Sequence, residues 1–305
     1  MDSERAQQWL RAAPVVFVLI WSTGFVVARL GMPHAPPFTF LSWRYALSVA
    51  LFALWVYFSS ARLPRDPWQW LHLGVAGVLL HAGYLGGVWA AIKDGISAGL
   101  VALLVGLQPI LTALWVAGVA RSEVLVRRQW AGLVLGLIGV LVVVYPKLGA
   151  GELSVSNLLL ALLALVSITA GALYQKRWVA AGDVRASNLV QLAAAFVVTA
   201  PLAWAFENEP IVLHPEFIIA MAWSVLVLTL GGSSLLVMLI QRGGATRVAS
   251  LFYLVPPLTA MLAWALFDEL LTPLVFVGLA LAAWGMAWVV RVPRAQPVPV
   301  MASKP

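Results

Sequence analysis

Two ionisable side chains in this sequence stand inside long runs of apolar residues. Arg44 lies about six residues into the run that begins at Phe38, and His81 lies near the middle of the run Leu71–Ile92. A charge at the centre of an apolar span costs about 2.5 to 3.5 kcal/mol or more, and such groups by default mark a polar cavity or a functional site. For Arg44 a structural role stays open, because a guanidinium can also bond the carbonyls of a broken helix or reach the nearer surface.

The segment around His81 brings aromatic groups to the same place. On a helix, His81, Tyr84 and Val88 share one face, and Trp89 follows directly. An imidazole, a phenol and an indole together can hold planar or cationic molecules through stacking and cation–π contacts. The alternative is that His81 only bonds a neighbouring helix and that the aromatic rings mark a membrane interface.

Other kinds of chemistry find little support in the spacing of the residues. Ser233 in the run Gly-Gly-Ser-Ser could be a nucleophile with His81 as its base, but no oriented base or oxyanion site accompanies it. No Walker motif is present, and the chain has no cysteine. The sequence therefore predicts no catalytic residue and no cofactor. It also predicts no metal site, because the four histidines have no paired spacing: His34, His72, His81 and His214.

Small polar residues in two apolar runs indicate possible bending points. Trp21 and Thr23 precede Gly24 in the first run, and Thr169 lies at the corresponding place in a later one. A hydroxyl can bond its own helix carbonyls and glycine permits a bend, so these helices could be gating elements. Close packing of helices on small residues is the alternative.

Prolines interrupt two further runs, at Gln108-Pro109 and at Pro256-Pro257. A proline inside a helix frees a carbonyl, which only protein or a water-lined cavity can satisfy at membrane depth. We therefore expect Gln108 and Tyr253 to line a cavity, and we interpret Pro109, Pro256 and Pro257 as kink or gating positions.

The elements that must position these residues follow from composition. Hydrophobic residues make up 62% of the chain, charged residues only 10%, and the mean hydropathy is +0.95, whereas a soluble domain carries about 25% charged residues. The solvent of the apolar runs is therefore the lipid bilayer, and each run has about the length that crosses it. The net charge of +7 lies between the spans and not on one patch, so no nucleic-acid partner is expected.

Ten transmembrane helices are predicted, and the fold class is an all-α membrane protein. With the N-terminus in the cytoplasm, fifteen of the 19 Lys and Arg residues lie on that side and three on the other. This bias is typical of cytoplasmic loops and places both termini in the cytoplasm. The predicted spans are 14–30, 38–58, 71–92, 98–119, 130–145, 158–174, 189–206, 217–240, 248–267 and 274–290.

The second half of the chain repeats the first. Pro109 corresponds to Pro257 at a separation of 148 residues, and Gly132 and Gly139 correspond to Gly278 and Gly285 at a separation of 146. Because a unit of five helices is odd in number, the second copy must enter the membrane from the opposite side, as in secondary transporters. We expect a first repeat over 1–147, a second, inverted repeat over 148–291, and a disordered tail over 292–305.

The sequence resembles the EamA family of the drug/metabolite transporter superfamily over residues 14 to 290. The resemblance is carried by Trp21-Ser22-Thr23-Gly24-Phe25, by Phe40-Leu41-Ser42-Trp43-Arg44-Tyr45, and by the duplicated proline, glutamate and glycine positions, Pro109, Glu123, Gly132 and Gly139 with Pro257, Glu269, Gly278 and Gly285. The family implies a ten-helix exporter of amino acids, metabolites or toxic compounds. It implies that helices 1 to 4 and 6 to 9 surround a central cavity, with helices 5 and 10 outside.

The function expected is export of a small-molecule substrate by alternating access across a bacterial-type inner membrane. Aromatic or hydrophobic amino acids or related amphipathic compounds suit a path bounded by aromatic rings better than sugars do. A multidrug or toxic-cation exporter of the same fold is the alternative, and an intramembrane enzyme using Ser233 and His81 is the alternative of a different class.

His81 would be the proton carrier if transport is coupled, since all twelve acidic residues lie outside or at the ends of the spans. Facilitated diffusion is the other possibility, and the chain is expected to be a monomer or a homodimer. The expected substrate-facing residues are Trp21, Thr23, Arg44, His81, Tyr84, Gln108, Thr169 and Tyr253.

Overall fold

The structure is a computed structural model that describes residues 2–119, 126–149, 153–180, 182–243 and 254–290. These residues form helices and no strands. In the first half the helices are α1 Asp2–Gly31, α2 Pro37–Phe58, α3 Pro67–Gly77, η1 Val78–Gly83, α4 Tyr84–Lys93, α5 Ala98–Val105, α6 Gln108–Leu114, η2 Trp115–Val119 and α7 Arg127–Gly149. In the second half they are α8 Val155–Trp178, α9 Val184–Phe206, α10 Pro215–Ala222, η3 Trp223–Ser233, α11 Ser234–Gly243, α13 Val255–Phe267 and α14 Pro273–Val290.

Several of these helices begin at residues that satisfy free backbone N–H groups. Asp66 accepts a bond from the N–H of Trp68 at the start of α3, which also has Pro67 in its first turn. Ser154 and Asn157 bond each other's backbone N–H in a capping box at the start of α8. Asp183 caps the start of α9 by accepting a bond from the N–H of Arg185, whose guanidinium, 2.6 Å away, lowers the pKa of this carboxyl. The ends of the apolar runs are therefore fixed by local polar contacts.

The surface of the molecule is apolar around the bundle. Large hydrophobic side chains such as Leu54, Leu141, Leu163 and Trp204 are exposed on the outer faces of four different helices. In water such a surface would be unfavourable, but it fits lipid chains. By length and composition, seven described helices can cross a membrane, and three shorter apolar stretches accompany them, Ala98–Leu114, Val255–Phe267 and Pro273–Trp288. The chain is therefore a multi-pass membrane protein.

Three of the expected spans differ in form from one uninterrupted α-helix. The fourth run divides into α5 and α6 at Gly106 and Leu107, directly before Gln108 and Pro109. The third and eighth runs each continue through a π-helical stretch, η1 and η3, in their middle. The hydrophobic pattern predicts neither feature, because the run is equally apolar whether the helix is continuous, broken or π-helical.

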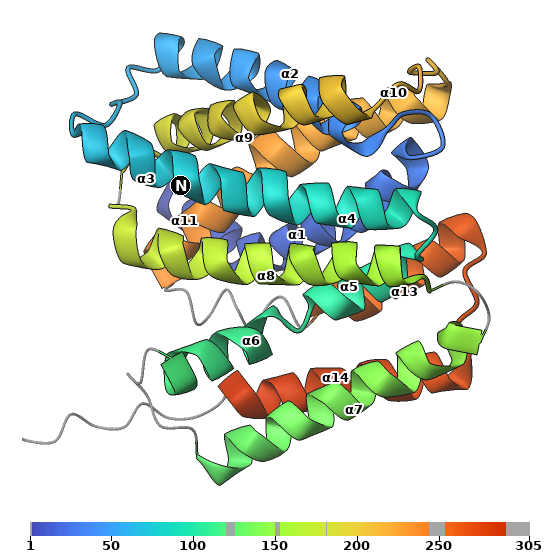
Figure 1. Ribbon diagram of the computed structural model, residues 1–305. Coiled ribbons are helices and arrows are strands. Elements are labelled where there is room, and N and C mark those ends of the chain that lie inside the picture. The colour runs from blue at the N-terminus through green and yellow to red at the C-terminus, as the bar shows by residue number, and fades with distance from the viewer. Residues whose placement is uncertain (1, 120–125, 150–152, 181, 244–253, 291–305) are drawn as a thin grey trace, which may run out of the picture.

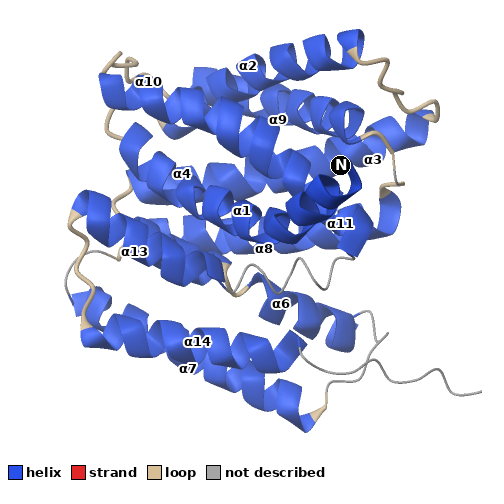
Figure 2. Ribbon diagram, turned by 180° about the vertical axis from the view of Figure 1, so that it is seen from behind, coloured by secondary structure: helices blue, strands red, loops and turns tan. Residues whose placement is uncertain are grey.

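The helices α7 and α14 form a separate pair along one edge of the molecule, as both views show (Figure 1, Figure 2). Their contact is made by glycines. A Cβ atom on Gly139 would lie 2.6 Å from the carbonyl oxygen of Gly278, and one on Gly285 would lie 2.5 Å from that of Gly132. The backbones can approach this closely only without side chains, so the pair is held by packing. The remaining helices pack around the residues with polar and aromatic side chains.

Candidate functional site

Four helical segments that contact one another build the candidate site, and they correspond in pairs. The helix α2 begins at Pro37 and α9 at Val184, 147 residues later. Similarly, α3 begins at Pro67 and α10 at Pro215, 148 residues later, and each continues into a π-helical stretch. Helical stretches of this type often occur at functional sites because they turn side chains out of the regular α-helical register. The correspondence identifies which residues of the two halves are equivalent.

Arg44 on α2 is buried between the halves. Its Nε donates a hydrogen bond to Thr229 Oγ1 on η3 at 3.2 Å, and its guanidinium lies 5.9 Å from the ring centre of Trp89 on α4. The ionisable side chains that act on it are the phenols of Tyr45 and Tyr84. Among the described residues, no carboxylate pairs with Arg44. A cation is thus held at the centre of the protein by one hydroxyl and an aromatic face.

His81 on η1 occupies the equivalent place, with the roles of the two halves exchanged. Its side chain faces that of Gln191 on α9, and its backbone carbonyl accepts a bond from Tyr45 Oη at 2.9 Å. Gln191 in turn lies 3.5 Å from the side-chain oxygen of Gln175 on α8. Arg44 and Gln191 are each the eighth residue of their helix, and His81 and Thr229 are each the fifteenth of their run. The two pairs therefore occupy equivalent positions in the two halves.

The structure brings part of the predicted set together. Trp21 on α1 lies beside Tyr84, which is buried and faces Arg44. Together with His81, these residues form one cluster around α2, the α3–η1–α4 run and η3.

The other predicted residues lie in contacts of their own. Thr23 accepts a bond from the Trp223 indole at 2.9 Å, and α1 runs through Gly24 without a break. Thr169 is buried and donates to the Leu165 carbonyl of its own helix at 2.7 Å. Gln108 is half-buried at the first turn of α6, and Tyr253 lies outside the described residues.

The predicted kink positions lie at the starts of short helices. Pro109 is in the first turn of α6, and Pro256 and Pro257 follow Val255 in the first turn of α13. A Cβ atom on Gly106 would lie 2.8 Å from the ring of Pro256. The interruption between α5 and α6 therefore packs directly on the start of α13.

Sequence reasoning missed four residues beside this cluster, all uncharged. Thr229 bonds Arg44, and Gln191 faces His81. Ser48, one turn beyond Arg44, and Ser224, whose carbonyl accepts from Thr229 Oγ1, have buried hydroxyls with no hydrogen-bond partner among the described residues. Thr229 could have been found by applying the separation of 148 residues, which relates Pro109 to Pro257, to His81. The serines gave no signal, since serine is common in packed membrane helices.

An apolar cavity of about 260 Å³ lies on the seam between α2 and the α10–η3 run. Leu47, Leu51, Met221 and Val225 are among the residues that line it, and none of the predicted substrate residues does. Leu47 is 44% exposed, so the cavity opens on the lipid-facing surface. It offers no polar group to a solute.

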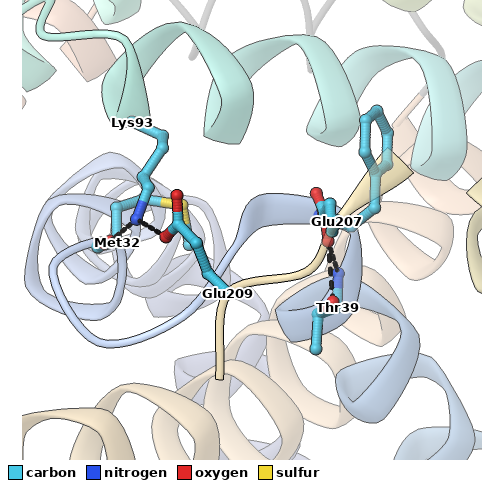
Figure 3. Close-up of polar contacts among 6 residues, drawn as sticks. Met32, Thr39, Lys93, Glu207 and Glu209 are labelled. Atoms are coloured by element: carbon cyan, nitrogen blue, oxygen red, sulfur yellow. Dashed lines mark hydrogen bonds and ion pairs between the residues drawn. The ribbon is translucent and has the colours of Figure 1, made fainter. Parts of the chain in front are cut away.

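At one end of the bundle, the loop 207–214 is bound to the start of α2 and the end of α4. The Glu207 carboxylate accepts bonds from the N–H groups of Phe38 and Thr39 at 2.8 and 2.6 Å, and Glu209 pairs with Lys93 at 2.7 Å (Figure 3). This end, called the His34 end below, joins residues of both halves.

The opposite end, called the His72 end, joins the start of α3 to the end of α8. His72 Nδ1 lies 2.8 Å from Tyr174 Oη, its ring stacks on Trp178, and Gln69 Oε1 accepts from the N–H of Ala180. At the His34 end, His34, which follows α1, lies 2.7 Å from Glu216 in the first turn of α10. Since α3 and α8 correspond to α10 and α1, equivalent helix ends meet at opposite ends of the bundle.

Acidic groups do not reach the cluster. In the described residues from 12 to 290, every Asp and Glu lies in a loop, at a helix cap or in a first turn. Ser233, the candidate nucleophile of the enzyme alternative, is the last residue of η3 and is half-buried.

Comparisons with known proteins agree with this architecture. The model of the EamA-like transporter family matches residues 12–145 and 155–291. A protein of Salmonella typhimurium named "Probable amino-acid metabolite efflux pump" is 29% identical over 281 residues, which cover 89% of this chain and 91% of that protein. One of the same name from Escherichia coli is 27% identical, and the uncharacterized transporter YwfM of Bacillus subtilis is 28% identical over 92% of this chain and 95% of its own. A solved crystal structure superposes with a TM-score of 0.67 at 19% identity, covering 90% of this chain and 94% of that one.

Proposed function

Because this chain belongs to the EamA-like transporter family, we propose that it exports amino acids or related carboxylate-bearing metabolites by alternating access. It is a transporter and not an enzyme, as the family and the names of its relatives indicate. We further propose ten spans in two inverted repeats, 1–147 and 148–291, in a bacterial inner membrane with both termini in the cytoplasm. Support comes from the seven long spans with three shorter apolar stretches and from the bias of the basic residues.

The observation that carries the substrate class is the buried charge of Arg44. A guanidinium in a low-dielectric surrounding is stabilised best by a carboxylate, which it can bind through two parallel hydrogen bonds. Nε is engaged by Thr229, and no described carboxylate pairs with the group. A carboxylate on the substrate would supply the missing negative charge. The same positive charge repels a cationic substrate, which disfavours the alternative of a toxic-cation exporter.

The rings beside Arg44 support an apolar or aromatic group on the same substrate. Trp89 is buried against the guanidinium, and Tyr84 interacts with both Arg44 and Trp21. Aromatic faces hold planar apolar groups in offset or edge-to-face contacts worth about 0.5 to 1.5 kcal/mol each beyond their buried area. Sugars, in contrast, need many converging hydrogen-bonding groups.

Alternating access is supported by the two ends of the bundle. The contacts of the His34 end and the His72 end join equivalent helix ends on opposite sides of the central cluster. In inverted repeats, a site between the halves is exposed first to one side and then to the other as such ends separate in turn. We infer that opening one end while the other stays closed moves the substrate.

The proposal includes facilitated diffusion, in which the concentration gradient of the substrate drives transport. Proton-coupled transporters usually keep an acidic side chain inside the membrane, and the described spans hold none in their middle. His81 is the one ionisable group that could carry a proton there, and its neighbour Gln191 is a neutral amide.

The direct test is counterflow of a labelled aromatic amino acid in proteoliposomes of the purified protein, with a sugar and an organic cation as matched controls. We expect exchange of the amino acid that does not depend on an imposed pH gradient. Exchange of the sugar or the cation without exchange of the amino acid would overturn the proposed substrate class.

A further inference from the structure

Three potential metal ligands meet at the His34 end, although one of them is separated from the other two by more than half of the chain. His34 lies in the loop after α1, His214 caps α10, and Glu216 is in the first turn of α10. His34 Nε2 is 2.7 Å from Glu216 Oε2, and His214 Nδ1 is 3.7 Å from the same oxygen. One ligand atom from each residue lies within 4.8 Å of the others. The sequence prediction of no metal site considered spacing along the chain, which this cluster does not follow.

The cluster is held in place by contacts that do not involve its ligand atoms. The N–H of Val212 donates to the carbonyl of His34 at 2.8 Å, which joins the two loops through their backbones. The rings of His34 and His214 stack with their centres 4.5 Å apart. Both imidazoles are thereby presented to one carboxylate from opposite halves of the chain.

We propose that these three residues bind a divalent transition-metal ion of the Zn²⁺ type. Two imidazole nitrogens and one carboxylate oxygen, with water as fourth ligand, are a ligand set that zinc adopts in proteins. In a tetrahedral site with bonds of about 2.0 to 2.2 Å, neighbouring ligand atoms lie about 3.3 to 3.5 Å apart. The separations of 2.7 and 3.7 Å lie on either side of this value. Because a metal ion lies in the plane of each imidazole that binds it, one of the two stacked rings must turn about its side-chain bonds to complete the site.

Binding has one local consequence for α10. His214 Nδ1 accepts a long bond of 3.4 Å from the N–H of Glu216, and a metal at Nδ1 replaces it. The site is otherwise open to water, since His214 is 50% exposed and Glu216 is 48% exposed at the side chain. A hydrated ion can reach it without displacing apolar packing.

The metal would connect the end of α1 to the start of α10. This part of the inference depends on the proposed alternating access, in which these ends must separate once in each cycle. A bound ion adds bonds that must break before separation, so it slows transport. The site is thus an inhibitory one for divalent transition metals.

Binding is tested with the full-length protein, purified without a histidine tag, by competition with a fluorescent zinc indicator. We expect one Zn²⁺ per chain and at least a tenfold loss of affinity in His34→Gln and in His214→Gln. His72→Gln is the matched control, because it removes a half-buried histidine from the opposite end. Equal affinity in all three variants would overturn the site.

Inhibition is tested by adding Zn²⁺ to both faces of the proteoliposomes, so that the orientation of the protein does not matter. Counterflow should slow in the wild type and in His72→Gln but not in His34→Gln. Zinc binding with unchanged counterflow would overturn the inhibitory role. Because the binding assay needs no transport, a failure of the proposed substrate class would not affect it.

Discussion

The Arg44–Thr229 contact and the Gln191–His81 contact occupy equivalent places in the two halves, yet only the first holds a fixed charge. Each contact joins the eighth residue of α2 or α9 to the fifteenth residue of the run that begins with α10 or α3. Both fifteenth residues lie within the π-helical stretches η3 and η1. The repeated geometry shows that this contact belongs to the architecture of the bundle. The charge, in contrast, belongs to one half only.

This difference separates what holds the halves together from what selects the substrate. A polar contact between the halves is satisfied by a neutral amide on the Gln191 side, so a guanidinium is not needed for packing. Burying the Arg44 guanidinium instead costs desolvation free energy, which the Thr229 hydroxyl and the Trp89 ring offset only in part. We infer that the charge is kept despite this cost because it binds a carboxylate of the substrate.

Replacing the charge should have the largest effect on transport. Arg44→Gln copies the residue of the equivalent position in the other half. We expect about a 100-fold fall in the rate of counterflow of aromatic amino acids, because losing one partner of a buried charge pair costs about 2 to 5 kcal/mol. Gln191→Leu is the matched control and should change it less than about fivefold on the loss of one neutral bond. A larger effect of Gln191→Leu would reverse the roles of the two sides.

Removing the aromatic face beside the charge should have the next largest effect. Trp89→Leu keeps an apolar side chain but loses a cation–π contact of about 0.5 to 2 kcal/mol and a ring for stacking. We expect about a tenfold fall in counterflow, with the preference for carboxylates kept. Trp284→Leu, on the exposed face of α14, should leave the rate unchanged.

The hydroxyl that orients the guanidinium should contribute less. Thr229→Val keeps the shape but removes the acceptor of the Arg44 Nε bond. A hydrogen bond to a charged group is worth about 1.5 kcal/mol at the weaker end of its range, so we expect a fall of up to about tenfold in transport. Thr229→Ser retains the hydroxyl and should retain most of the rate. Equal losses in both variants would indicate that packing of the methyl group, and not the bond, is important.

The neutral side should show the smallest effect. His81→Gln keeps a group that can bond Gln191, and we expect a change in counterflow of less than about twofold, within the range of a conserved polar contact. Flux should also remain independent of an imposed pH gradient. A gradient-driven flux in the wild type that His81→Gln abolishes would make His81 the proton carrier and contradict facilitated diffusion.

The sequence predicted those features that depend on hydrophobicity and charge. Arg44 and His81 stood out because ionisable groups are rare in apolar runs, and the helical fold followed from the runs themselves. Thr229 and Gln191 gave no such signal, because a neutral polar residue in a span is inexpensive. The π-helical stretches and the interruption at Gly106 depend on packing against other helices, such as that of Gly106 on Pro256.

Loops limited the prediction in another way. His34 and Glu216 are separated by 182 residues, and only the fold brings them within 2.7 Å. Spacing along the chain identifies metal ligands within one helix or one turn, but not between loops of different halves.

Binding of the substrate carboxylate by Arg44 can be measured by comparing phenylalanine with its amide in counterflow. The amide keeps the ring and the amino group and has an uncharged carboxamide in place of the carboxylate. We predict that the wild type prefers the acid by about 100-fold, the size of a lost buried charge pair, and that Arg44→Gln shows no preference. An Arg44→Gln variant that still prefers the acid as strongly as the wild type would contradict the account.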